Sequence, residues 1–350
     1  MGKKPLLWGK NHKPFIIPLF IPHMGCPHRC VFCDQGTITG YKNGRLSPEK
    51  VRDTIREYLR FKGKRRGSVE AAFYGGNFLG LPTSAREALL DAAQRFVEQG
   101  EVESIRFSTR PDTVSHGTLG ALAPYAVRAV EVGAQSMDDT VLALSRRGHT
   151  GAQTKDAVKR LRAHGFQVGL QIMPGLPGDT PTSILETGHR VAQLQPDFVR
   201  IYPTVVVKNT PLAKSYALGR FTPLSLTEAV ELTKKLYLLL TGCGIQVIRM
   251  GLQPSGSLLV DGHVLAGPFH PAFGHLVHGA VFLDRATQAF KDQPGLSKKV
   301  TLKVYPKDLS KLLGLKKENI KHLIKRFGLE ELRVMADPAV VRETVQLKNM

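Results

Sequence analysis

Three cysteines stand close together near the start of the chain, at Cys26, Cys30 and Cys33 in the segment GCPHRCVFC. Their spacing, Cys-x3-Cys-x2-Cys, supplies three thiolate ligands from one short segment and leaves a fourth position open. Three thiolates can bind three irons of a [4Fe–4S] cluster, so that the remaining iron is free to take a small molecule. The sequence therefore predicts an iron–sulfur cluster with one exchangeable site.

A closed zinc site is the main alternative for these cysteines. Zinc sites of the Cys3His type add one histidine, and both His23 and His28 lie close by. Such sites usually join two separate hairpins, whereas every candidate ligand here falls in one segment behind an apolar run, 15–22, typical of a buried strand. Four cysteines in 350 residues, with no secretory signal, indicate a reducing compartment rather than disulfides. We expect the fourth, Cys243, to be a small buried apolar side chain.

Strand-like and helix-like segments alternate along the first 250 residues. Apolar runs predict strands at 15–21, 69–75, 103–109, 127–134, 166–173, 197–203 and 245–250. Helical spacing of apolar residues predicts helices at about 48–61, 84–99, 138–146, 152–164, 182–194 and 225–241, and Ser47 and Pro48 are expected to start the first. Repeated strand–helix units build a parallel sheet with helices outside it. Six strand–helix units are too few for a complete eight-stranded barrel. We therefore expect an α/β fold, a partial (β/α)6 TIM-type barrel. In such a barrel the chemistry lies at the carboxyl ends of the strands.

The chain is expected to divide into a core at 1–250, a loop-rich extension at 251–297 and a small basic α+β domain at 298–350. Glycine and proline are frequent in the extension, and the tail has a strand, two helices and a strand. The net charge is +20, from 49 basic and 29 acidic residues, and it suits a polyanion such as RNA as well as a merely solvated surface. Ten basic residues fall between 298 and 329: Lys298, Lys299, Lys303, Lys307, Lys311, Lys316, Lys317, Lys321, Lys325 and Arg326. No apolar run reaches the roughly 20 residues that span a membrane, and we expect a cytoplasmic protein.

Glycine or polar motifs follow successive strands, where a barrel builds its site. Gly75 and Gly76 follow the second strand, and paired glycines let a ligand approach the backbone, although a tight turn also uses them. Arg110, in STRPD after the third strand, can hold a carboxylate through two hydrogen bonds, the alternative being a helix-start motif. Glu131 and Gln135 share one face of the fourth strand, and a buried glutamate needs a partner.

The cysteine spacing, with Phe32 before the last cysteine, and the ordered strand-end motifs resemble the radical S-adenosylmethionine (radical SAM) superfamily. The resemblance implies that the open iron chelates S-adenosylmethionine, and that one electron cleaves a C–S bond to give a 5′-deoxyadenosyl radical. An electron donor such as flavodoxin or ferredoxin is implied as a partner. The cysteines would ligate the cluster, and the implied cofactor-binding residues are Phe32, Gly75, Gly76, Ser108, Arg110, Glu131, Gln135 and Gly175.

A narrower resemblance covers about residues 15–255 and is densest from 105 to 225. The runs RRGHT (146–150), MPGLPGDT (173–180) and IYPTVV (201–206) are similar to the radical SAM core of the catalytic subunit of Elongator, which modifies wobble uridines in tRNA. That subunit has a longer gap between its first two cysteines and carries an acetyltransferase domain, and nothing after residue 255 resembles such a domain. The resemblance implies an RNA substrate, with tRNA preferred, and leaves acetyl transfer unsupported.

Two other functions stay open at this point. The cysteine spacing also suits relatives of oxygen-independent coproporphyrinogen oxidase, which would make the substrate a small anionic metabolite or a porphyrin. The second open function is that of a non-catalytic RNA-binding protein with a structural metal. The intact motifs at four strand ends argue against this function. The tail faintly resembles a KH domain, but Lys317 stands where the second glycine of the GxxG loop would follow Gly314. An RNA-binding role for the tail is as well supported as a purely structural one.

Overall fold

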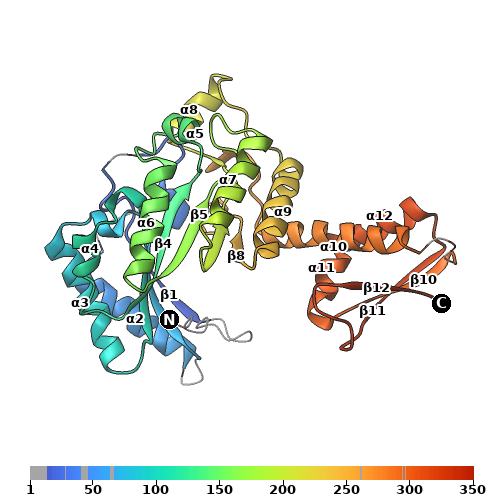
Figure 1. The fold of residues 1–350 in the computed structure, drawn as a ribbon, viewed down its shortest axis with the longest axis horizontal. Coiled ribbons are helices and arrows are strands. Elements are labelled where there is room, and N and C mark those ends of the chain that lie inside the picture. The colour runs from blue at the N-terminus through green and yellow to red at the C-terminus, as the bar shows by residue number, and fades with distance from the viewer. Residues whose placement is uncertain are drawn as a thin grey trace.

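A curved, seven-stranded parallel sheet forms the larger part of the molecule (Figure 1). The computed structural model describes residues 14–27, 29–40, 46–63, 67–260, 262–293, 295 and 297–350. The strands, in their order across the sheet, are β1 (Phe15–Phe20), β2 (Val69–Tyr74), β3 (Ser104–Thr109), β4 (Val127–Gln135), β5 (Gln167–Ile172), β6 (Phe198–Ile201) and β8 (Gln246–Met250). Every neighbouring pair is parallel. The predicted partial barrel is confirmed, and the strand expected at 245–250 adds a seventh strand to it.

Helices wrap the outer face of this sheet (Figure 1). The longer ones are α2 (Pro48–Lys62), α3 (Thr83–Glu98), α6 (Gly151–Ala163), α7 (Pro181–Gln193) and α9 (Leu226–Gly242), and the shorter ones are α4 (His116–Gly120) and α5 (Asp139–Leu144). Ser47 caps α2 by accepting from the Lys50 amide, and Pro48 follows at the first helical position, as predicted. Among the described residues no helix is both long and apolar enough to cross a membrane.

Alternation along the strands separates an apolar outer face from a polar inner face. On β3, Ile105 and Phe107 join the main apolar core, whereas Arg106 and Ser108, at the alternate positions, are buried polar residues. The core residues of the strands pack against the apolar stripes of the helices, such as Val51 and Ile55 of α2. The concave inner face is left without a helix layer, so polar side chains fill it.

Glu131 on β4 is the centre of that polar interior. Its carboxylate is fully buried and meets Arg200 of β6 (Nε–Oε2, 2.7 Å) and Arg106 of β3 (Nη1–Oε1, 3.5 Å). Gln171 of β5 donates to it as well (3.0 Å), and Arg106 also pairs with Glu70 of β2 at 2.5 Å. Burial opposes ionisation of Glu131, but the two guanidinium groups outweigh it and hold its pKa below the usual value. One carboxylate therefore links β4 to its neighbours β3 and β5 and to β6 beyond β5.

The stretch expected to be loops, 251–297, contains a 19-residue helix, α10 (Phe273–Lys291), and a short strand, β9 (Val264–Ala266). That expectation was wrong because the frequent glycines and prolines lie mainly before residue 273. From Phe273 onward, Val277 and Val281 recur at intervals of four on one buried helix face. β9 pairs with β7 (Val206–Val207), so the chain returns to the barrel before α10 begins.

A small α+β unit follows α10 and forms the separate lobe of Figure 1. Its elements are β10 (Lys299–Val304), α11 (Leu309–Leu313), α12 (Glu318–Phe327), β11 (Glu331–Ala336) and β12 (Val345–Asn349). The strand order is β11-β10-β12, with β10 parallel to β11 and antiparallel to β12. Phe282, Ala286 and Phe290 of α10 belong to the apolar core of this unit. The helix is therefore both the connection to the small unit and a layer of it.

Replacing Glu131 by glutamine keeps the side-chain volume but removes the charge that neutralises Arg200 and part of Arg106. Breaking a buried ion pair from one side leaves an uncompensated charge, so we expect Glu131→Gln to lower the free energy of unfolding by about 3–5 kcal/mol. The matched control is Glu103→Gln. Glu103 forms a surface ion pair with Arg128 at 2.6 Å, and such a pair contributes under about 1 kcal/mol to stability. Urea denaturation of both variants measures the difference. Equal losses would contradict the central role of Glu131.

Candidate active site at the barrel mouth

One cavity of about 620 Å³ brings the predicted cluster ligands and the strand-end motifs together. Cys26, Cys30 and Cys33 lie on the segment between β1 and α1 (Gln35–Thr39), carry free thiols and all line the cavity. The other predicted residues that line it are Phe32, Gly75, Gly76, Ser108, Arg110 and Gln135. Each of these comes from the cysteine segment or from the carboxyl end of a strand. The position expected for a barrel site is therefore the position observed.

Close backbone packing fixes the cysteine segment against the turn after β2. Gly76 has φ +57, and a Cβ there would lie 2.4 Å from the carbonyl oxygen of Ile21. The Gly76 amide donates to Gln35 Oε1 at 2.8 Å, which ties this turn to the first residue of α1. Gly76 therefore allows the close approach that a larger residue would block.

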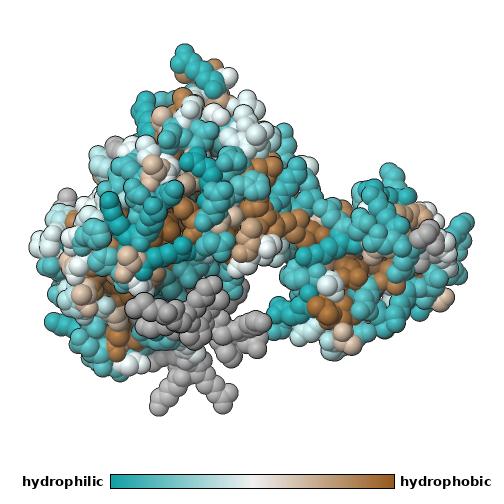
Figure 2. Space-filling view, in the orientation of Figure 1, coloured by the Kyte–Doolittle hydropathy of each residue, from teal (hydrophilic) through white to brown (hydrophobic). Residues whose placement is uncertain are grey.

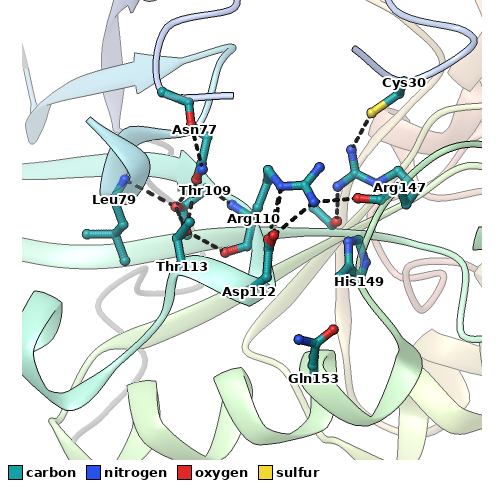
Figure 3. Close-up of polar contacts among 12 residues, drawn as sticks. Cys30, Asn77, Leu79, Thr109, Arg110, Asp112, Thr113, Arg147, His149 and Gln153 are labelled. Atoms are coloured by element: carbon teal, nitrogen blue, oxygen red, sulfur yellow. Dashed lines mark hydrogen bonds and ion pairs between the residues drawn. The ribbon is translucent and has the colours of Figure 1, made fainter. Parts of the chain in front are cut away.

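Asn77, which follows the two glycines, is fully buried and joins three segments. Its Nδ2 donates to the carbonyl of Gly25 (2.9 Å), and its Oδ1 accepts from the Arg110 amide (3.0 Å) and the Thr109 hydroxyl (2.7 Å). Figure 3 shows the end of this network beside Thr109 and Thr113. Asn77 does not line the cavity, so an amide at this position positions the cysteine segment rather than contacting a ligand.

Arg147 contacts a cluster cysteine directly, and the sequence did not assign it to the site. Its Nη1 donates to Cys30 Sγ at 3.1 Å and its Nη2 to the carbonyl of Gly133 at 2.7 Å (Figure 3). Its own carbonyl accepts from Arg110 Nη2. Arg147 belongs to the RRGHT run, which in the sequence indicates the family resemblance but no role in the site. Because it follows α5 rather than a strand, the strand-end criterion did not find it.

Arg110 is only partly free to bind a ligand. Its Nε and Nη2 each donate to Asp112 at 2.9 Å, which leaves Nη1 buried with no hydrogen-bond partner among the described residues (Figure 3). Gln135 Oε1 is buried and unpartnered in the same way. Native proteins satisfy nearly all such groups, so two of them in one cavity indicate a polar ligand there.

The zinc alternative draws no support from His23. The Nε2 atom of His23 accepts from the Gln35 amide at 3.1 Å, at the start of α1, and burial lowers the pKa of the ring. His28 lies outside the described residues. In the described part of the chain, no three His, Cys, Asp or Glu side chains converge closely enough to hold a single metal ion. A [4Fe–4S] cluster instead takes each thiolate on a separate iron.

The residues of the cavity fit a cluster and S-adenosylmethionine. Burial, together with the neighbouring thiols of Cys30 and Cys26, raises the pKa of the Cys33 thiol to about 12, so the three sulfurs lie within electrostatic reach of one another. Burial also raises the pKa of Cys26. Iron supplies the positive charge that makes such buried thiolates stable. The unpartnered donor of Arg110 and acceptor of Gln135 suit the carboxylate and amino groups of the cofactor.

Two residues predicted to bind the cofactor do not line the cavity. Glu131 lies in the polar interior of the sheet with both oxygens bonded to protein groups. Gly175 has φ +83, and its amide donates to Asp179 Oδ2 at 3.1 Å, so it forms the turn after β5. Cys243 is also not where we expected it, because it is exposed at the C-cap of α9 rather than buried.

Replacing any one of Cys26, Cys30 and Cys33 by alanine should abolish a cluster that reconstituted protein otherwise holds at about four irons and four sulfides per chain. Cys243→Ala is the control, because that thiol does not line the cavity and its loss should leave iron content unchanged. Iron and sulfide analysis after anaerobic reconstitution provides the measurement. A full cluster in the triple variant would rule out these ligands.

His149 should make the folded apoprotein less stable as the pH falls. Burial, together with Arg147 and Arg110, lowers its pKa to about 3. Below pH 6.5 the unfolded chain protonates this ring and the folded chain does not, so stability declines between pH 6.5 and about 3, by up to about 1.4 kcal/mol per pH unit. His149→Gln should therefore lose stability less steeply between pH 6.5 and 5 than the wild type.

The exposed His189 provides the control for this effect. His189→Gln should keep the wild-type slope of unfolding free energy against pH. Urea denaturation at several pH values compares the three proteins, and an unchanged slope in His149→Gln would show that this ring titrates normally in the folded state.

Comparison with known proteins agrees with this geometry. Residues 20–191 match the radical SAM superfamily, and residues 196–281 match the radical SAM C-terminal domain. The chain is 29% identical over 230 residues to a tRNA uridine(34) acetyltransferase of Dehalococcoides mccartyi, covering 57% of this chain and 50% of that protein. It is 27% identical over 256 residues to Elongator complex protein 3 of Schizosaccharomyces pombe, covering 60% and 47%. The chain thus spans about half the length of these relatives.

A solved structure shows the same fold. The archaeal Elp3 of Methanocaldococcus infernus superposes with a TM-score of 0.62 at 21% identity, over 76% of this chain and 62% of that one. The two family matches together cover more than half of the chain and include all three cavity cysteines. The resemblance predicted from the cysteine spacing is confirmed: the chain belongs to the radical SAM superfamily of enzymes, which use a [4Fe–4S] cluster and S-adenosylmethionine, and its relatives include Elongator Elp3 proteins.

Proposed function

We propose that the protein is a radical SAM enzyme that modifies RNA, with tRNA as its preferred substrate. The observation that carries the proposal is the single cavity that joins three free thiols to unpartnered donors and acceptors at the strand ends. When bound, the cluster supplies one electron that cleaves S-adenosylmethionine and yields a 5′-deoxyadenosyl radical for hydrogen abstraction. The matched relatives named as tRNA uridine(34) acetyltransferase and Elongator complex protein 3 support tRNA as the substrate.

The protein's own contribution is to bind, orient and shield. Cys26, Cys30 and Cys33 would ligate the cluster, and Arg147 holds Cys30 through its guanidinium. Gly75 presents backbone groups to the cavity beside Arg110 and Gln135, and these three residues would hold the amino acid part of S-adenosylmethionine.

The segment after β8 closes one side of the cavity. Leu252, Gln253 and Ser255 line the cavity, and Ser257 Oγ donates to the carbonyl of Thr37 in α1 at 2.5 Å. The chain after the last strand therefore contacts the helix behind the cysteines, on the far side of the mouth. Such a covering limits the access of water to a reactive site.

The exposed basic face of α12 supports an RNA-binding role for the small unit. The exposed cations are Lys316 and Lys317, in the turn just before the helix, and Lys321, Lys325 and Arg326 within it, and no described carboxylate pairs with any of them. Lys303 and Lys311, by contrast, are held by Asp337 and by Asp308 with Glu343. The viewed face of this unit is mostly hydrophilic (Figure 2). Phosphate contacts, rather than base reading through a GxxG loop, are the mode that these side chains suit.

The direct test of the function is mass spectrometry of tRNA nucleosides from cells with and without the gene. We expect one modified nucleoside to disappear, or its precursor to accumulate, when the gene is deleted. The supporting control restores the gene in its native form and in a Cys33→Ala form, and only the native form should restore the nucleoside. Identical nucleoside profiles in all strains would reject tRNA modification and favour a small anionic metabolite as the substrate.

Charge reversal of Lys316, Lys317 and Lys321 to glutamate should weaken tRNA binding and lower its salt dependence. Each neutralised phosphate contributes about 0.7–0.9 to the slope of log K against log salt, so the slope should fall by about 2. Charge reversal is a cleaner test than truncation after residue 296, because truncation would expose Phe282 and Phe290 of α10.

The matched control replaces three exposed cations of α2 by glutamate: Lys50, Arg56 and Arg60. It changes the net charge by the same amount as the Lys316, Lys317 and Lys321 variant. Anisotropy titrations with labelled tRNA across a salt series compare both triple variants with the wild type. If the α12 variant binds with the wild-type affinity and slope, the small unit is a structural cap.

A further inference from the structure

Five arginines line the cavity, and no Asp or Glu of the described chain does. They are Arg29, Arg110, Arg147, Arg200 and Arg249. A concave site with this charge attracts anions, because the surrounding protein screens the cations less than water does. An arginine that is not paired with a carboxylate or bonded to a thiol of the protein would be available to bind an anion.

Three of the five are bound to other side chains, and a fourth is exposed. Arg110 pairs with Asp112, Arg147 bonds to Cys30, and Arg200 pairs with Glu131. Arg29 belongs to the cysteine segment itself, between Cys26 and Cys30. Arg110, Arg147 and Arg200 are therefore bound to other side chains, whereas Arg29 is exposed to solvent.

Arg249 differs from the others. It is half-buried on β8, and in the described part of the chain its Nε and Nη2 donate to the backbone carbonyls of Gly251 (3.2 Å) and Leu252 (3.3 Å). No described carboxylate forms an ion pair with it. In the sheet register it lies directly beside Arg200, a like charge. Burial and that neighbour both work against its positive charge, and its pKa lies below the usual value. A guanidinium in this position is stabilised by pairing with an anion.

Arg249 and the cysteine segment reach the cavity from the two edge strands of the sheet. β8 is the last strand of the sheet and β1, which leads into the cysteine segment, is the first. Around Arg249 the cavity is lined by Tyr202, Leu252 and Gln253, and the Tyr202 hydroxyl also accepts from Arg200 at 3.4 Å. This half has a cation, a phenol and an amide, the groups that bind a phosphate and stack on or bond to a base.

We propose that Arg249, with the hydroxyl of Tyr202, forms a subsite for a phosphate of a nucleotide substrate at the edge of the sheet opposite the cluster. The proposal deepens the proposed function and rests on it, because it places the substrate's anionic group in the same cavity. The guanidinium offers two parallel donors to phosphate oxygens, and the planar fork suits a phosphate better than a lysine would.

The test compares binding of uridine 5′-monophosphate and uridine to the full chain, reconstituted with its cluster and S-adenosylmethionine, by ligand-observed NMR titration. Wild-type protein should prefer the monophosphate by about 10- to 100-fold, the range of one charge-assisted hydrogen-bonded pair. Arg249→Gln should lose this preference while uridine binding stays within about twofold, and Arg249→Lys should retain part of it. Arg333→Gln, an equal charge change on exposed β11, should behave as wild type.

The outcomes separate this proposal from the proposed function. No preference for the monophosphate in wild-type protein, or an unchanged preference in both Arg249 variants, overturns the subsite. Weaker binding of S-adenosylmethionine in Arg249→Gln, measured by equilibrium dialysis, with the monophosphate preference intact, also overturns it and assigns Arg249 to the cofactor. If Arg249→Gln does not fold, as judged by its unfolding transition, the Arg249→Lys result decides. A confirmed subsite together with unchanged tRNA nucleosides in the deletion strain would reject only the RNA assignment.

Discussion

The ion pairs of Glu131 with Arg106 and Arg200 are the interaction on which the rest of the structure depends. An open half-barrel has a concave face with no helix layer, and a water-filled interior would leave seven strands joined only by their ladders. Glu131 instead connects β3, β4 and β6 through charge and β5 through Gln171. The polar network also forms the underside of the cavity, because Arg200, Gln171 and Ser108 line it. The contacts that hold the sheet in its curve therefore also set the charge beneath the site.

The cavity above this network has two halves built by different means. Near β1, glycines at tight turns and the buried Asn77 hold the cysteine segment against the carboxyl ends of β2 and β3. Near β8, a strand edge and the segment that follows it present Tyr202, Arg249 and Gln253. On our proposal the first half would hold the cofactor and the second a substrate carrying negative charge. The exposed cations of α12 extend the same preference for anions to the surface of the small unit.

Local signals made the fold and half of the site predictable. The cysteine spacing, the capped start of α2 and the alternation of strands and helices each depend on neighbours in sequence, and the structure has all three. Partnerships across the sheet were not predictable, since the sequence gives no sign that Glu131 meets Arg200 or that Arg147 meets Cys30. Helix α10 was not predicted, because the glycines and prolines ahead of Phe273 made the whole stretch 251–297 look like loops.

The central claim is that this barrel mouth performs radical chemistry on tRNA, and one measurement tests it directly. Anaerobically reconstituted protein is reduced with dithionite and given S-adenosylmethionine, with and without tRNA from the deletion strain, and 5′-deoxyadenosine is quantified by liquid chromatography. The account predicts deoxyadenosine formation that rises severalfold with this tRNA and is absent in Cys33→Ala. Formation of S-adenosylhomocysteine alone, or no deoxyadenosine with any tRNA, would contradict it.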